Sequence, residues 1–478
     1  MQYKSTRGDV VDCSFSDSVL WGSTDKHGLF IPNNFPNYSK KDLEEMRSMN
    51  YQELALRIMS DFIGDIPRGD LEKLIRKSYT REIFGTDAIT PITKISKEKY
   101  LLELFHGPTL AFKDLALQFL GNTFDYILEE MDSTTNILTA TSGDTGSAAI
   151  EATRRRKRLR AFVLTPEGRM SPFQTAQMYS VLDPGVFNIA VNGTFDDCQA
   201  MVKEAGEDKE FRDKYHLGYM NSINWTRVLA QIVYYAKGVF EIQRRENLPV
   251  DAFVDAATPT GNFGDVLAGY YAKKIGIPIG QLDLATNENN VLDIFFKDGI
   301  YRIRKKEDVI VTDSPSMDIT SASNFERYIY DIAHEDPKVI NDLWKQVKEE
   351  MFFDISNTPY FENVKNSGIV SGSTIKRERY DAIKKIYNET GIIIDPHTAN
   401  GAVVAEQYKR EGVPMMCLAT ASPIKFEDSI KEALGQDIVL ERPEQFRGIE
   451  DRPKRYVRME RGDVDSLKKF VAEHSISL

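Results

Sequence analysis

The chain reads Asn136-Ile-Leu-Thr-Ala-Thr-Ser-Gly-Asp-Thr-Gly146, and this stretch decides its fold class. Residues 136–141 are mostly apolar or β-branched, as in a buried strand, and a glycine turn follows them. A helix is predicted from about Gly146. Its first backbone N–H groups would favour an anion, and the small residues before it would let that anion approach closely. The unit is typical of α/β folds, and a plain loop with an N-capped helix stays open as the alternative.

The same alternation of strand, turn and helix continues to about residue 440. Strands that alternate with helices imply parallel sheets joined by right-handed crossovers. Residues 1–90 instead predict a small, mostly helical N-terminal domain, and residues 441–478 predict a charged tail with a helix near Val464 to His474. Further strands are expected at 160–165, 187–191, 251–256, 391–395 and 415–420, and N-terminal helices at 40–46, after Tyr51 and at 71–79.

The composition excludes several classes of function. A net charge of -11 and a pI near 5.3 argue against a nucleic-acid partner, because phosphate backbones need a basic surface. No apolar run approaches the ~20 residues of a membrane helix, and the N-terminus lacks the apolar core of a signal peptide. The three cysteines form no C-x-x-C pair, which disfavours disulfides and a zinc site. We therefore expect a cytoplasmic protein without nucleic-acid, membrane or metal partners.

A second glycine turn, Thr260-Gly-Asn-Phe-Gly-Asp265, follows the strand predicted at 251–256 and precedes another helix. Two glycines free the backbone for a phosphate, and the helix dipole adds favourable charge. No Gly-Lys-Ser/Thr follows, so the turn is not a Walker loop, and it does not match the dinucleotide fingerprint G-x-G-x-x-G. A glycine turn without a ligand is the alternative.

Lys113 is the candidate nucleophile, in His106-Gly-Pro-Thr-Leu-Ala-Phe-Lys-Asp114. A lysine desolvated among apolar neighbours has a lowered pKa and can act as an amine. An amine together with a separate phosphate cradle is what pyridoxal phosphate (PLP) requires. Thr420 ends the strand predicted at 415–420, where ligands of open α/β sheets bind. Taken alone, Lys113 also fits a surface lysine and Thr420 a structural residue.

These segments together resemble the threonine synthase family of PLP fold type II, which also includes tryptophan synthase β and serine dehydratase. The separate N-terminal domain is similar to that of the bacterial and fungal form. The resemblance covers most of the chain, in the order Tyr3-Lys-Ser-Thr-Arg-Gly8, the Lys113 segment, Ala140-Thr-Ser-Gly-Asp-Thr-Gly146, Asn221-Ser-Ile-Asn-Trp225, the 260–265 turn, Asp395-Pro-His-Thr-Ala399 and Ala419-Thr-Ala-Ser-Pro-Ile-Lys-Phe426.

The resemblance implies a two-lobed core with PLP in the cleft and a Schiff base on Lys113. The large lobe would comprise about 91–121 and 226–440, and the small lobe about 122–225. The implied reaction converts O-phospho-L-homoserine and water into L-threonine and phosphate, with Lys113 as the base. A phospho-lyase that releases 2-oxobutyrate and ammonia, and a non-catalytic homologue, stay open. The expected assembly is a monomer or homodimer.

The resemblance also implies roles for further residues. One departure is Ser422, which stands where a histidine is expected. Arg7 is a further candidate for the substrate phosphate, and His397 fits a structural residue better than a catalytic one. The implied cofactor contacts are Gly261, Asn262, Phe263, Asp265 and Thr420, and the implied substrate contacts are Ser142, Asp144, Thr145, Asn221, Ser222, Asn224, Arg227 and Lys425.

Overall fold

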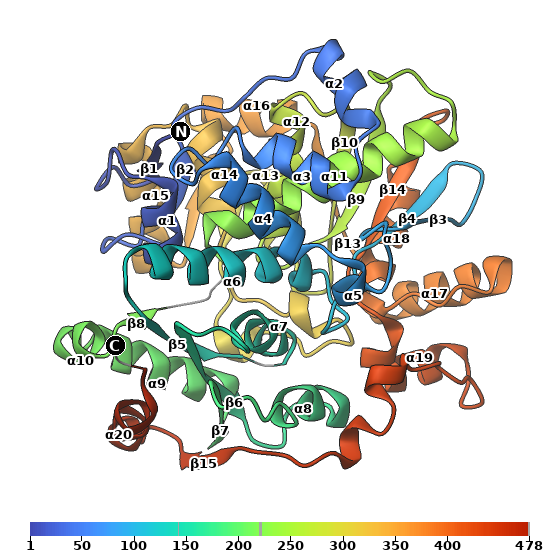
Figure 1. The fold of residues 1–478 in the computed structure, drawn as a ribbon. Coiled ribbons are helices and arrows are strands. Elements are labelled where there is room, and N and C mark those ends of the chain that lie inside the picture. The colour runs from blue at the N-terminus through green and yellow to red at the C-terminus, as the bar shows by residue number, and fades with distance from the viewer. Residues whose placement is uncertain (142, 219–221, 477–478) are drawn as a thin grey trace.

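The structure is a computed structural model that describes residues 1–141, 143–218 and 222–476. Its core contains two sheets in two lobes, and Figure 1 shows the larger lobe above the smaller one. Neighbouring strands in both sheets are parallel, except for the antiparallel edge pair β3–β4. The predicted α/β class with two lobes is therefore confirmed.

The two sheets have different connectivity. The large-lobe sheet has the order β13-β10-β9-β14-β4-β3, with β3 (Ile92–Lys94), β4 (Lys99–Glu103), β9 (Val254–Pro259), β10 (Ile279–Thr286), β13 (Ile369–Ser373) and β14 (Met415–Ala419). The small-lobe sheet has the order β15-β7-β6-β5-β8, with β5 (Thr135–Ala140), β6 (Leu159–Pro166), β7 (Val186–Asn192), β8 (Leu217–Gly218) and β15 (Val457–Glu460).

The large-lobe sheet is buried on both faces. Side chains alternate along a strand, so Met416 and Leu418 of β14 belong to the main hydrophobic cluster while Cys417 belongs to a second one. Burial on both sides explains why β14 is apolar throughout. The main cluster includes α11 (Trp225–Arg245) and α12 (Gly264–Lys274), and the second includes α17 (Lys376–Thr390) and α18 (Pro396–Gln407).

The N-terminal helices pack on the core rather than standing apart from it. The ring of Trp225, the first residue of α11, lies 6.1 Å from that of Tyr3 and 6.0 Å from that of Phe62. The N-terminal domain therefore covers the start of α11. The three predicted helices are confirmed as α2 (Lys40–Arg47), α3 (Tyr51–Met59) and α4 (Arg68–Ser78), and α4 packs on α6 (Lys113–Glu130).

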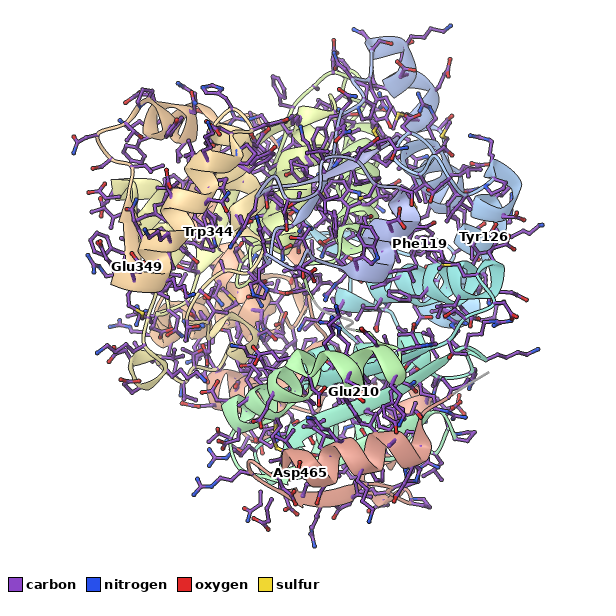
Figure 2. All side chains as sticks on the ribbon, turned by 90° about the vertical axis from the view of Figure 1, so that its left-hand side faces the viewer. Phe119, Tyr126, Glu210, Trp344, Glu349 and Asp465 are labelled. Atoms are coloured by element: carbon purple, nitrogen blue, oxygen red, sulfur yellow. The ribbon has the colours of Figure 1, made fainter. Side chains whose placement is uncertain are left out.

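The C-terminal segment completes the small lobe. Strand β15 pairs in parallel with β7, and Leu467 and Val471 of the predicted helix, α20 (Val464–His474), are buried in the small-lobe core. Figure 1 shows this segment running from the large lobe to the far edge of the smaller one, and Figure 2 shows Glu210 of α10 and Asp465 of α20 on the same lobe. The other small-lobe helices are α7 (Asp144–Thr153), α8 (Pro172–Tyr179), α9 (Phe195–Glu207) and α10 (Lys209–Lys214).

The strand predicted at 391–395 is wrong. Gly391 ends α17 with a φ of 73°, and the Asp395 side chain caps α18, so the segment only links two helices. Its isoleucines pack against the second hydrophobic cluster without pairing to a strand, because an apolar run signals burial as readily as a β ladder. Among the described helices, none is both long and apolar enough to cross a bilayer.

The remaining elements surround these layers. They are β1 (Tyr3–Ser5), β2 (Phe30–Pro32), α1 (Phe15–Trp21), α5 (Arg81–Phe84), α13 (Val291–Asp298), β11 (Ile300–Arg302), α14 (Phe325–Ile332), α15 (Pro337–Glu350), β12 (Phe352–Asp354), α16 (Pro359–Asn366) and α19 (Glu427–Leu434).

Candidate active site

A cavity of about 330 Å³ lies at the carboxyl ends of β9, β14 and β5. Residues from both lobes line it, so it lies where ligands of open α/β sheets bind. The structure brings to this cavity many of the residues that the sequence singled out, namely Lys113, Ser222, Arg227, Gly261, Asn262, Phe263, Asp265 and Thr420.

Lys113 is the first residue of α6 and is held against the end of β14. The backbone N–H of Phe112 donates to the carbonyl of Thr420 at 2.8 Å, and that of Ser422 donates to the carbonyl of Leu110 at 3.0 Å. Leu110 has a φ of 60°, which a leucine adopts only where its surroundings hold it. These two bonds fix the backbone of Lys113 beside that of Thr420.

Two buried ionisable side chains, Asp114 and Lys425, support the loop before Lys113. Asp114 is fully buried and accepts hydrogen bonds from the N–H and hydroxyl of Thr109 at 2.8 and 2.7 Å. Burial raises the pKa of Asp114 to about 6. The Lys425 ammonium group is buried and donates to the Thr109 carbonyl at 2.9 Å. Lys425 supports this loop and is not among the residues that line the cavity, and its contact with the substrate stays a prediction.

The 260–265 turn forms an anion cradle at the start of α12. Phe263 has a φ of 64°, and a Cβ atom at Gly261 would lie 2.7 Å from the Ser316 carbonyl oxygen. The Asn324 backbone and side chain both donate to the carbonyl of Asn262, at 3.1 and 3.3 Å. The first N–H groups of a helix have no partner within it, so they can face an anion in the cavity.

Asp265 is the only carboxyl group of the 260–265 turn, and its side chain is buried. Asp265 accepts a hydrogen bond from the Tyr234 hydroxyl at 2.5 Å, and Tyr235 lies close enough to lower its pKa further. Burial nevertheless raises the pKa of Asp265 to about 7. A carboxyl group with a raised pKa opposes a nearby phosphate less than an ordinary carboxylate would.

Arg227 brings a buried positive charge to the cavity wall. It lies in the first turn of α11 and is 5% exposed. Its Nε and Nη1 atoms are buried, and neither has a hydrogen-bond partner among the described residues. Burial lowers the pKa of the guanidinium group to about 10. A buried cation without a counter-ion is costly, so this position is suited to an anionic ligand.

The small-lobe predictions are described only in part. Ser142 and Asn221 lie outside the described residues. Asp144 and Thr145 are the first two residues of α7. Ser222 lines the cavity, and its hydroxyl lies 2.9 Å from that of Ser323. The end of β5 and the residue Ser222, shortly before α11, thus approach the same cavity.

Three further candidates have structural partners. Asn224 caps α11 and donates to the carbonyl of Val19 at 2.8 Å, and it does not line the cavity. Arg7 pairs with Glu326 at 2.8 Å. His397 does line the cavity, with its Nδ1 atom 2.9 Å from Asp395 Oδ1. Asn224 and Arg7 therefore connect the N-terminal residues to the core, and their contact with the substrate stays a prediction.

Sequence reasoning missed the loop between β11 and α14. Ser316, Asp318 and Asn324 from this loop line the cavity, although the loop has no regular periodicity. The one available signal was the run Thr320-Ser-Ala-Ser-Asn324 before an apolar helix, which is typical of a helix start. Nothing in that run indicates which side chains reach a ligand.

Comparison with known proteins accounts for the whole chain. A family model described as "Threonine synthase N terminus" matches residues 2–79, "Pyridoxal-phosphate dependent enzyme" matches 86–336, and "Threonine synthase, C-terminal" matches 398–471. The threonine synthase of Methylobacillus glycogenes is 46% identical, over 99% of this chain and 100% of its own length. The chain belongs to the threonine synthase family.

Solved structures of the family agree with this fold. PLP-bound threonine synthase from Brucella melitensis has a TM-score of 0.93 at 37% identity and covers 100% of both chains. Threonine synthase from yeast has the same TM-score and identity, over 99% of this chain and 98% of its own. The chain is a PLP-dependent enzyme.

Proposed function

We propose that the chain converts O-phospho-L-homoserine and water into L-threonine and phosphate. The observation that carries this proposal is the presence of two separate anion sites in one cavity. The 260–265 turn suits the cofactor phosphate, and Arg227 suits a second phosphate on the substrate. A buried cation in addition to the turn that suits the cofactor phosphate fits a substrate that itself carries a phosphate.

The cofactor would be held at three places. The Lys113 amine would tether it, the N–H groups around Gly261 and Phe263 would bind its phosphate, and Thr420 would face its ring nitrogen. Bound PLP acts as an electron sink for bonds at the substrate Cα atom. A threonine hydroxyl, unlike a carboxylate, does not hold a proton on the ring nitrogen, which favours elimination over competing reactions.

Lys113 is the proposed base. Its amine, released when the substrate amine replaces it, would remove the proton from Cα and pass that proton on before it removes one from Cβ. It would return a proton to Cα after the phosphate has left and water has added. One amine can serve several atoms because the steps follow each other. The bonds that hold the 110–112 backbone to 420–422 keep this amine near the cofactor throughout.

The substrate phosphate would lie against Arg227 and Ser222. A guanidinium group and a hydroxyl give a phosphate both charge and directed hydrogen bonds. Both residues belong to the segment that opens α11, so one element would position the leaving group. The carboxylate of the substrate would meet the loop between β5 and α7, including Ser142, Asp144 and Thr145, as the family resemblance implies.

Incubation with O-phosphohomoserine in ¹⁸O-labelled water tests the proposal. Elimination and hydration place the label on the threonine hydroxyl and leave the released phosphate unlabelled. A phosphatase would instead label the phosphate. Release of 2-oxobutyrate and ammonia without threonine would replace the proposal with the phospho-lyase alternative, which shares the first half of the reaction.

A further inference from the structure

Arg327 is a second buried arginine without a carboxylate partner. It lies on α14 and is fully buried. Its guanidinium group donates to the Phe30 carbonyl at 2.8 Å, to Asn324 Oδ1 at 2.7 Å and to the Ile223 carbonyl at 2.6 Å. All three acceptors are neutral. The adjacent carboxylate, on Glu326, is bonded to Arg7 and Thr6 instead.

Arg379 is also fully buried, but carboxylates compensate its positive charge. Arg379 pairs with Glu288 at 2.8 Å and also with Asp313. Arg327 receives no such pair from the described residues, and burial lowers the pKa of its guanidinium group to about 10. A buried cation that keeps only neutral partners destabilises the fold, which points to a purpose beyond packing.

The partners of Arg327 connect it to both anion sites. Asn324, which lines the cavity, donates through Nδ2 to the Ser222 carbonyl at 3.1 Å and to the Asn262 carbonyl at 3.3 Å. The Ile223 carbonyl belongs to the segment that leads into Arg227. One guanidinium group thereby holds the cofactor cradle and the proposed substrate-phosphate segment in register.

The third partner belongs to the N-terminal domain. Phe30 lies on β2, and its carbonyl accepts directly from Arg327 Nε. The ring of Trp225 lies 5.9 Å from the Arg327 guanidinium carbon and closes the same space. The N-terminal domain therefore contributes to the orientation of the cavity wall without lining this cavity itself.

We propose that Arg327 is a positioning residue for both phosphates. It sets the separation of the 260–265 turn and the 222–227 segment through Asn324 and the Ile223 carbonyl. Its charge lies one side chain away from the cavity, because Asn324 bonds to Arg327 and lines the cavity, so the charge favours phosphate groups bound there. This inference rests on the proposed function for the identity of the second phosphate, but not for the first, which belongs to the cofactor.

The primary test is Arg327→Lys, which keeps the charge and loses the three-way geometry, because an ammonium group cannot reproduce the planar guanidinium fork. We expect at least a tenfold rise in the dissociation constant of PLP and in the inhibition constant of inorganic phosphate. KM for the phosphorylated substrate should rise much more than kcat falls. A folded variant with all three constants within twofold of the wild type would overturn the proposal.

A second variant covers the possibility that Arg327→Lys does not fold. Asn324→Asp keeps the acceptor for Arg327, supplies it with a carboxylate and removes the two amide donations to Ser222 and Asn262. We expect unchanged or higher thermal stability together with the same loss of PLP and phosphate affinity. Unchanged affinities in this variant would also overturn the proposal.

Asp331→Asn is the matched control. It changes a carboxylate on the same helix, which accepts from the Tyr270 hydroxyl at 2.5 Å, but leaves Asn324 and the Ile223 carbonyl in place, so PLP and phosphate affinities should not change. An equal loss in this control would reduce Arg327 to a packing role. Phosphate and PLP binding are measured without turnover, so failure here is distinguishable from a failure of the proposed reaction.

Discussion

The backbone N–H of Phe112 donates to the carbonyl of Thr420 at 2.8 Å, which joins the start of α6 to the end of β14. Ala111 and Ala421 form a backbone bridge beside it. The lysine and the threonine proposed to meet opposite ends of the cofactor are thus held by the main chain. Their relative position does not depend on any flexible side chain.

Lys113→Ala should leave a folded protein without turnover. The lost amine is the proposed base, and removing such a group typically lowers rates by about 10²- to 10⁴-fold. Activity, the visible absorbance of the bound cofactor and the melting temperature are the measurements. Lys97→Ala, at an exposed position, is the control and should behave like the wild type. Full activity in the Lys113 variant would refute the assignment.

Arg227→Gln should weaken the binding of the phosphorylated substrate and should stabilise the ligand-free protein. The variant removes a buried charge whose Nε and Nη1 atoms are unpartnered, so the melting temperature in phosphate-free buffer should stay equal or rise. We expect kcat/KM to fall by about 10²-fold or more, as for the loss of a charged hydrogen-bonding group.

Inorganic phosphate separates this role from a structural one. A ligand present at 100 times its dissociation constant stabilises a protein by about 2.7 kcal/mol. Phosphate should therefore raise the melting temperature of the wild type more than that of Arg227→Gln. Equal shifts in the two proteins would count against a phosphate site at Arg227.

Thr420→Ala should retain PLP and lose part of the rate. Thr420 is 5% exposed and lies in the cavity wall, so its closely packed neighbours should keep their positions in the alanine variant. We expect kcat to fall by about tenfold or more, because a hydrogen bond to the cofactor ring would be lost. Thr420→Ser should restore most of it. An unchanged rate in the alanine variant would remove Thr420 from the site.

Asp283→Asn should change how stability depends on pH. Asp283 lies on β10, its Oδ1 atom accepts from Gln281 at 2.7 Å, and its Oδ2 atom has no hydrogen-bond partner. Burial raises its pKa to about 7. The folded state therefore binds a proton that the unfolded state has already lost, and stability falls as pH rises from the unfolded pKa of about 4 through 7.

The asparagine variant has no such proton to lose. It should gain stability over the wild type as the pH is raised from 5 to 8, by an amount on the order of a few kcal/mol. Denaturant unfolding at both pH values measures the difference. Asp42, an exposed carboxyl whose pKa is lowered by hydrogen bonds from Ser39, provides a control without this loss at alkaline pH. A difference between wild type and Asp283→Asn that is the same at pH 5 and 8 would contradict the prediction.

Local chemistry made several features readable in the sequence. Gly261, in the turn before α12, indicates a close approach to the backbone of Ser316, which a Cβ atom would block. The spacing of apolar residues indicates that one face of a helix is buried, so α2 to α4 and α20 could be predicted. The run 391–395 shows the limit, because burial alone does not determine whether a segment pairs with a strand.

Local patterns in the sequence were therefore enough to predict the α/β class, a candidate lysine for the cofactor aldehyde and two turns able to bind anions. The tertiary structure was needed to find which cations lie at the cavity. Lys425 is occupied by the Thr109 carbonyl, whereas Arg227 keeps two unpartnered nitrogens and Arg327 joins Phe30 to Asn324. The role of a charged side chain depends on the groups that it contacts. These groups come from distant segments of the chain, and no local sequence pattern connects them.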